Sequence, residues 1–149
     1  MDRGTDSDEA RYEKARAAAD AVRAHFEDRD PYMAEHSVRV ASWCGLLSRN
    51  IPGMSRSRQR VLEVTALLHD FGMTLVDPAI ARKESGLDDD ERQQIERHPE
   101  LGAQNAPGPD EFVDRDAIRW HHKHFDGSGY PEGPMRGLDI PLEARILGL

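Results

Sequence analysis

The chain has 149 residues with a formal net charge of −8 at pH 7, and its length predicts one domain with a buried core. The acidic balance disfavours binding to a DNA or RNA polymer, and no apolar run approaches the roughly 20 residues of a membrane span. Cys44 is the single cysteine, so no internal disulfide can form and a cytoplasmic location is expected.

Two helices are expected at the start of the chain. Residues 8–27 carry a thin apolar stripe at helical spacing, which consists of Ala15, Ala18, Val22 and Phe26. We interpret residues 1–29 as an N-terminal connector helix, and whether it belongs to the main domain stays open. Asp30 suits an N-cap and Pro31 the first position of a second helix that runs to about residue 49. The inward face of this second helix is expected to carry His36, Val40, Trp43 and Leu47.

The middle of the chain predicts two more helices. The first ends at Gly72 and has His69 on its apolar stripe. Residues 73–86 read as a loop with one short helical turn. Asp88 followed by Glu91 is a capping-box pattern, which predicts the start of the next helix.

The C-terminal part is also expected to be helical. Residues 99–104 and about 111–123 read as helices, the second with His121 and His122 on its inward face. After a loop rich in glycine and proline, a final helix is still running at Leu149, so we expect the main domain, residues 30–149, to be truncated at its C-terminus. Because no period-two run of strand length occurs, the predicted class is all-α, a bundle of about six to seven helices.

Histidines recur on the expected inward faces of four helical stretches. Imidazoles and a carboxylate that converge in a protein interior need a cation between them, because a buried charge without a partner costs free energy. The candidate ligands are His36, His69, Asp70, His98, His121 and His122. A set rich in histidine and free of cysteine disfavours structural zinc and favours iron or manganese. Two such ions would activate a water for phosphoester hydrolysis. Any one of these histidines taken alone is more often a hydrogen-bonded core residue than a metal ligand.

Five motifs in a fixed order carry a family resemblance. HSVRVA, LLHDFG, RHPELG, HHKHFDGSGYPEG and IPLEARIL resemble the HD-GYP family of cyclic di-GMP phosphodiesterases, within the HD superfamily of metal-dependent phosphohydrolases. The resemblance implies a helical bundle of the HD-domain type with a metal site in its core and two divalent ions, iron or manganese. It implies hydrolysis of cyclic di-GMP to linear pGpG or GMP. A diguanylate cyclase or another signalling protein is then an expected partner, and a homodimer stays open.

The resemblance also assigns roles to individual residues. One metal would take His36, His69 and Asp70, and the other would take Asp70, His98, His121 and His122. Asp70 would bridge the two ions, and Asp70 with His69 would be the catalytic pair. The substrate or signature loop would consist of Asp126, Gly127, Gly129, Tyr130 and Pro131. Tyr130 would either pack against neighbouring helices or face the substrate.

Three positions depart from the family pattern. Met73 stands where the family usually has a lysine that assists the phosphate, and a thioether carries no charge. Lys123 stands where a glutamate often follows the paired histidines, and the last aspartate ligand of the family would lie beyond Leu149. Met73 and the missing last aspartate support a second hypothesis, a catalytically weak or degenerate module with a regulatory, nucleotide-sensing or partner-docking role. A third hypothesis, a different HD-type phosphohydrolase acting on nucleotides, is disfavoured by the Gly-Tyr-Pro loop.

Overall fold

The computed structural model describes residues 3–149, with side chains from residue 7 onward. Within that range the regular elements are helices and no strand is formed, so the predicted all-α class is confirmed. The chain divides into two compact units. The first unit comprises Met1–Leu68 and Pro107–Asp114, and the second comprises His69–Ala106 and Arg115–Leu149. No helix among the described residues has both the length and the apolar character needed to cross a lipid bilayer.

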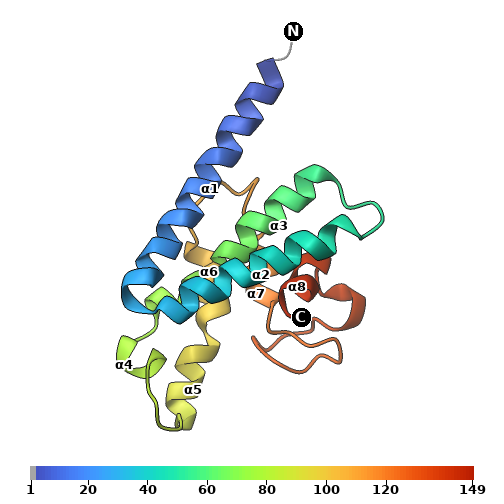
Figure 1. Cartoon of the computed structure of the whole chain (residues 1–149). Coiled ribbons are helices and arrows are strands. Elements are labelled where there is room, and N and C mark those ends of the chain that lie inside the picture. Colours follow the sequence, from blue (N-terminus) through green and yellow to red (C-terminus); the bar gives the residue numbers. More distant parts are fainter. Residues whose placement is uncertain (1–2) are drawn as a thin grey trace. The chain divides into compact units, whose positions relative to one another are not determined.

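The first unit is built on three helices that pack against one another, α1 (Arg3–Arg29), α2 (Pro31–Arg49) and α3 (Arg56–Leu68), drawn from blue to green in Figure 1. Helix α1 begins earlier than the predicted residue 8. Its stripe is buried at Ala15, Ala19, Val22 and Phe26, so Ala19 takes the place predicted for Ala18. Helix α2 begins as predicted, because the Asp30 carboxylate accepts a hydrogen bond from the backbone N–H of Met33 at 3.3 Å.

The buried face of α2 differs from the prediction. Its buried residues are small or weakly polar, namely Ala34, Ser37, Cys44 and Ser48. Trp43, expected to face inward, is 65% exposed, and Leu47 is 38% exposed. The Ser37 hydroxyl donates to the Met33 carbonyl at 3.1 Å, so its burial leaves no unsatisfied donor. Small side chains allow α2 to approach its neighbouring helices closely, which is why the large apolar residues do not mark the buried face.

The second unit contains shorter elements. They are η1 (Phe71–Leu75), α4 (Pro78–Ala81), α5 (Asp89–Glu96), α6 (His98–Asn105), α7 (Arg115–Trp120), η2 (Gly137–Asp139) and α8 (Leu142–Leu147). The short turn expected within residues 73–86 is α4. Helix α5 carries the predicted capping box, in which the Glu91 N–H donates to Asp88 at 2.8 Å and the Asp88 N–H donates to Glu91 at 2.9 Å.

Two predicted helix ends are wrong, and both lie beside candidate ligands. Helix α3 ends at Leu68 rather than at Gly72, so His69 lies in the turn that leads into η1. Helix α7 ends at Trp120, and His121 with His122 lie in the turn that follows it. The core of this unit forms where α7 packs on α6 and α8, around fully buried side chains such as Ile118. His69, Asp70, His121 and His122 therefore lie in turns at helix ends, and His98 is the first residue of α6.

Candidate metal centre

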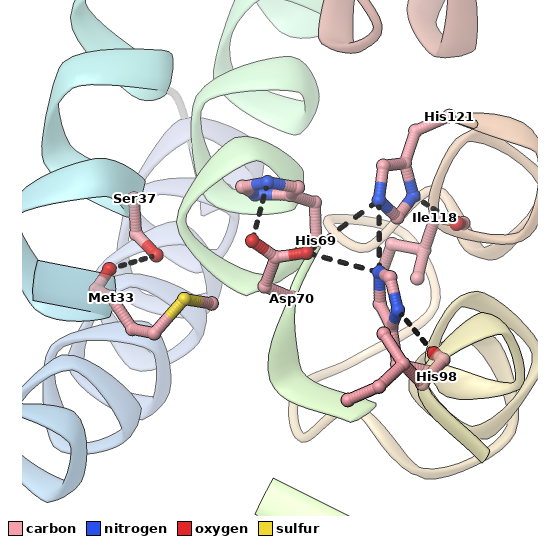
Figure 2. A network of polar contacts seen from close by, with 8 residues as sticks. Met33, Ser37, His69, Asp70, His98, Ile118 and His121 are labelled. Carbon is pink, nitrogen blue, oxygen red and sulfur yellow. Dashed lines mark hydrogen bonds and ion pairs between the residues drawn. The ribbon is translucent and has the colours of Figure 1, made fainter. Parts of the chain in front are cut away.

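The Asp70 carboxylate is the centre of a buried cluster of imidazoles in the second unit (Figure 2). Its Oδ1 atom lies 3.2 Å from Nε2 of His98 and 3.6 Å from Nε2 of His121. Its other oxygen, Oδ2, lies 3.0 Å from Nε2 of His69. Asp70 is 7% exposed and the three histidines are 3–4% exposed, so the cluster is shielded from bulk water.

Gly72 and Gly102 allow η1 and α6 to approach closely enough to bring Asp70 beside His98. A Cβ atom added at Gly72 would collide with the backbone carbonyl oxygen of His98 and would lie 2.8 Å from the backbone nitrogen of Gly102. A Cβ atom at Gly102 would lie 3.3 Å from the backbone nitrogen of Gly72. The close packing that forms the cluster therefore requires glycine at position 72 and leaves little room for a side chain at position 102.

Backbone carbonyls set the tautomers of His98 and His121. The Nδ1 atom of His98 lies 2.8 Å from the Ile95 carbonyl, and that of His121 lies 2.6 Å from the Ile118 carbonyl (Figure 2). A carbonyl oxygen only accepts hydrogen bonds, so each Nδ1 must carry the proton. In a neutral ring the Nε2 atom then presents a lone pair. Metal-binding histidines commonly donate such a hydrogen bond from the other ring nitrogen to a carbonyl, which fixes the orientation of the ring.

The two Nε2 atoms face each other without a donor between them. They are 3.4 Å apart, and both lie near Asp70 Oδ1, which also only accepts when it is ionised. Burial lowers the pKa of His121 below its ordinary value, and the neighbouring His69 and His98 act in the same direction against the pull of Asp70. His121 is therefore held neutral near pH 7. Three electron-pair donors that converge in a buried space fit a divalent cation.

His122 completes this donor set. One nitrogen or oxygen atom from each of Asp70, His98, His121 and His122 lies within 4.8 Å of the others. Burial lowers the pKa of His122 to about 3, with smaller contributions from His121 and His98, so this ring is also neutral and able to donate an electron pair. One carboxylate and three imidazoles are suitable ligands for iron or manganese. The second unit thus contains a cluster that could hold a metal ion.

His69 and His36 are the two remaining predicted ligands. His69 contacts the oxygen of Asp70 that faces away from His98 and His121, as Figure 2 shows. His36 lies on α2 in the first unit, where its half-buried ring stacks on Tyr32 with centroids 6.3 Å apart. Its role as a metal ligand stays a prediction.

The signature loop folds back onto the residues that follow α7, where Lys123 and Gly129 form an isolated antiparallel β-bridge. The Tyr130 N–H donates to the His122 carbonyl at 3.3 Å. Gly127 and Gly129 have φ angles of +94° and +81°, a left-handed conformation that favours glycine, and a Cβ atom at Gly129 would collide with the His122 carbonyl oxygen. The Tyr130 ring stacks on His122 with centroids 4.6 Å apart. The ring therefore packs against candidate ligands, and its contact with a substrate stays a prediction.

Burial raises the pKa of the Tyr130 phenol to about 12, and the negative charges of Asp70 and Glu96 act in the same direction. The phenol thus stays protonated and its hydroxyl remains a hydrogen-bond donor near pH 7. The ring also lies edge-on to His98, with centroids 6.1 Å apart. Tyr130 therefore covers one side of the imidazole cluster with an aromatic face.

Lys123 supports the same loop, a role that the sequence did not reveal. Its side chain is buried, at 7% exposed, and its ammonium donates to the Pro131 carbonyl at 3.2 Å and to the Gly129 carbonyl at 3.5 Å. The sequence marked this residue only as a departure from a family pattern. Asp126, at the start of the loop, accepts from the N–H and the hydroxyl of Ser128 at 2.8 and 2.6 Å. These contacts hold the loop shape from both ends.

This structure belongs to the class of helical proteins in which a buried aspartate surrounded by histidines could hold a metal ion. A model of the HD-domain family matches residues 20–149. The chain belongs to the HD-domain family, as its resemblance to HD-GYP proteins predicted.

Curated relatives of this chain are named phosphodiesterases. The chain is 32% identical to the cyclic di-GMP phosphodiesterase response regulator RpfG of Xanthomonas campestris, over 92% of this chain and 36% of that protein. It is 36% identical to the 3'3'-cGAMP-specific phosphodiesterase 3 of Vibrio cholerae, over 80% of this chain and 26% of that protein. It is 27% identical to a cyclic di-GMP phosphodiesterase of Thermotoga maritima, over 83% of this chain and 34% of that protein. The chain thus spans about a third or less of the length of these relatives.

Proposed function

We propose that this chain provides the metal-dependent phosphodiesterase module of a protein that hydrolyses cyclic di-GMP to linear pGpG or GMP. The proposal rests on one observation above all, the convergence of Asp70 Oδ1 with the lone pairs of His98 and His121 in a buried space. The names of its relatives supply the class of substrate. A signalling partner such as a diguanylate cyclase, and a homodimer, remain predictions.

The proposed mechanism assigns a task to each group of residues. Asp70, His98, His121 and His122 would hold one divalent ion, iron or manganese, and His36, His69 and Asp70 would hold a second, with Asp70 shared between them. When bound, the ions supply the positive charge that activates a water and neutralises the phosphodiester. The carbonyls of Ile95 and Ile118 orient two of the imidazoles, which lowers the cost of organising the site. The Tyr130 ring shields the cluster from bulk water.

A turnover assay on the metal-loaded protein tests this function. The protein would be loaded with Mn²⁺ or Fe²⁺, its metal content measured by mass spectrometry, and its products from cyclic di-GMP and 3'3'-cGAMP separated by chromatography. We expect two ions per chain and linear dinucleotide from cyclic di-GMP. Asp70→Asn should abolish turnover, and the matched control Asp139→Asn, which removes an exposed carboxylate in η2, should not. Full metal loading without any product would refute the proposed activity.

A second candidate, a weakly catalytic module that senses the nucleotide, is favoured by Met73 in η1. This half-buried thioether lies three residues after Asp70, where the family usually has a lysine. The ammonium of Lys83, the next lysine along the chain, lies 2.5 Å from the Glu91 carboxylate and is therefore already paired. If loss of a phosphate contact limits the rate, Met73→Lys should raise turnover by at least about tenfold. An unchanged rate in that variant would refute this explanation of weak activity.

A further inference from the structure

A polar cavity lies within the first unit, between α1, α2 and α3, and in Figure 1 α1 crosses the pair formed by α2 and α3. Its volume is about 670 Å³, which is within the range of sites that bind small molecules. Five arginines from the three helices line it, against two carboxylates. These arginines are Arg16, Arg23, Arg49, Arg56 and Arg60, and the carboxylates are Asp20 and Glu63. The excess of positive charge is notable because the whole chain is acidic.

Three of the arginines are already neutralised by carboxylates. Arg16 forms an ion pair with Glu63, and Arg23 forms one with Glu27. Arg60 contacts both carboxylate oxygens of Glu9, at 3.0 and 2.7 Å. These pairs hold the guanidinium groups in place. The positive charge that they do not neutralise belongs to other residues of the lining.

Arg49 and Arg56 carry that remaining charge. Arg49 lies at the C-terminal end of α2 and Arg56 at the N-terminal end of α3, and both side chains line the cavity. Neither has a carboxylate partner among the residues whose side chains are described, from residue 7 to 149. Both residues are exposed, and a guanidinium group is suited to an anion with several oxygens, such as a phosphate group.

A network of hydrogen bonds and ion pairs holds other residues of the cavity lining in place. The Tyr12 hydroxyl donates to Glu63 at 2.9 Å, and the guanidinium of Arg60 lies over the Tyr12 ring, 4.4 Å from its centroid. The Nε atom of Arg16 is buried and has no hydrogen-bond acceptor in the described part of the chain. The same atom lies 3.9 Å from Oδ2 of Asp20, so a second ion pair also holds the Arg16 side chain.

We propose that this cavity binds a phosphorylated small molecule of about nucleotide size, at a site separate from the metal centre. The five arginines of the lining favour an anion, guanidinium groups bind phosphate oxygens through paired hydrogen bonds, and the volume has room for more than a single small ion. Non-specific attraction of anions does not explain such binding, because the net charge of −8 repels them. The site is independent of the proposed phosphodiesterase activity.

Calorimetric titration with inorganic pyrophosphate tests the proposal. The protein would be treated with EDTA, so that the metal centre cannot contribute, and titrated in about 150 mM salt, where weak surface attraction is screened. We expect one pyrophosphate per chain. Arg49→Gln and Arg56→Gln should each weaken binding at least about tenfold, because each removes a charge-assisted hydrogen bond. Arg92→Gln is the matched control, since it removes the same charge from an exposed position on α5.

Two outcomes would overturn the proposal. The first is wild-type protein that binds no pyrophosphate at millimolar concentration, and the second is equal weakening by all three substitutions. Amide chemical shifts of the wild-type protein give a readout that needs no variant. Added pyrophosphate should move signals of residues that line the cavity, such as Ser42 and Gln59, and movement confined to the second unit would also overturn the assignment.

Discussion

Replacing Gly72 with alanine tests whether the close approach of η1 to α6 is required for the fold. The new Cβ atom would collide with the His98 carbonyl oxygen and lie 2.8 Å from the Gly102 nitrogen. Both obstacles are backbone atoms, so no side chain can rotate to relieve the overlap. Overpacking in a protein interior usually costs about 1–3 kcal/mol. Because two backbone segments must separate here, we expect the upper end of that range, a loss of about 3 kcal/mol in the free energy of unfolding.

Thermal and urea unfolding of the metal-free protein measure this loss. For a chain of this length, about 3 kcal/mol corresponds to a fall in Tm of roughly 6–12 °C. Gly86→Ala is the matched control, because a Cβ atom at Gly86 meets nothing within 4 Å. That substitution should change the free energy of unfolding by less than about 1 kcal/mol.

A second readout follows from the position of Gly72 beside the cluster. Separation of η1 from α6 would move the Asp70 carboxylate away from His98, so Mn²⁺ binding should weaken together with stability. Equal unfolding midpoints for Gly72→Ala and Gly86→Ala would refute the reasoning, because the packing would then tolerate the additional atom.

Three further substitutions or reactions have definite expected outcomes. Removing a group that only orients a metal ligand typically lowers metal affinity by roughly 10- to 100-fold. Asp70→Asn removes a ligand itself, so it should weaken Mn²⁺ binding, measured by calorimetry, by more than that. Lys123→Met should lower the free energy of unfolding by about 1–3 kcal/mol, because the carbonyls of Gly129 and Pro131 lose their donor. Burial raises the pKa of Cys44 to about 11, so at pH 8 iodoacetamide should alkylate the folded protein roughly a hundredfold more slowly than the unfolded chain, with the rate rising toward pH 11.

Each of these expectations has a control and a contrary result. Asp139→Asn should leave Mn²⁺ affinity unchanged, and an Asp70→Asn protein that binds as tightly as the wild type would exclude Asp70 as a ligand. Lys14→Met removes an exposed lysine on α1, and a loss of stability equal to that of Lys123→Met would show that the loop contacts contribute nothing. Rapid alkylation of Cys44 at pH 8 without denaturant would mean that α2 opens readily.

Local interactions account for the parts of the fold that the sequence predicted well. The Asp30 cap of α2 and the capping box of Asp88 and Glu91 join residues three positions apart, so neighbouring residues alone determine them. The all-α class followed from helical spacing in the same way. The buried face of α2 was predicted wrongly, because it depends on which helices pack against it and how closely.

In the candidate site, too, some features followed from the sequence and others from tertiary packing. The sequence by itself identified the residue types, since aspartate and histidine at these positions form a donor set that suits a divalent cation. Only the tertiary structure decided that Asp70, His98 and His121 converge, because they come from three separate segments whose approach depends on glycine at positions 72 and 102. The tertiary structure also decided the part played by Lys123, since an ammonium group finds its carbonyl acceptors only after the loop has folded back. Neighbouring residues determine helix caps and turns, whereas side chains from separate segments meet at a buried site only once the backbone has packed.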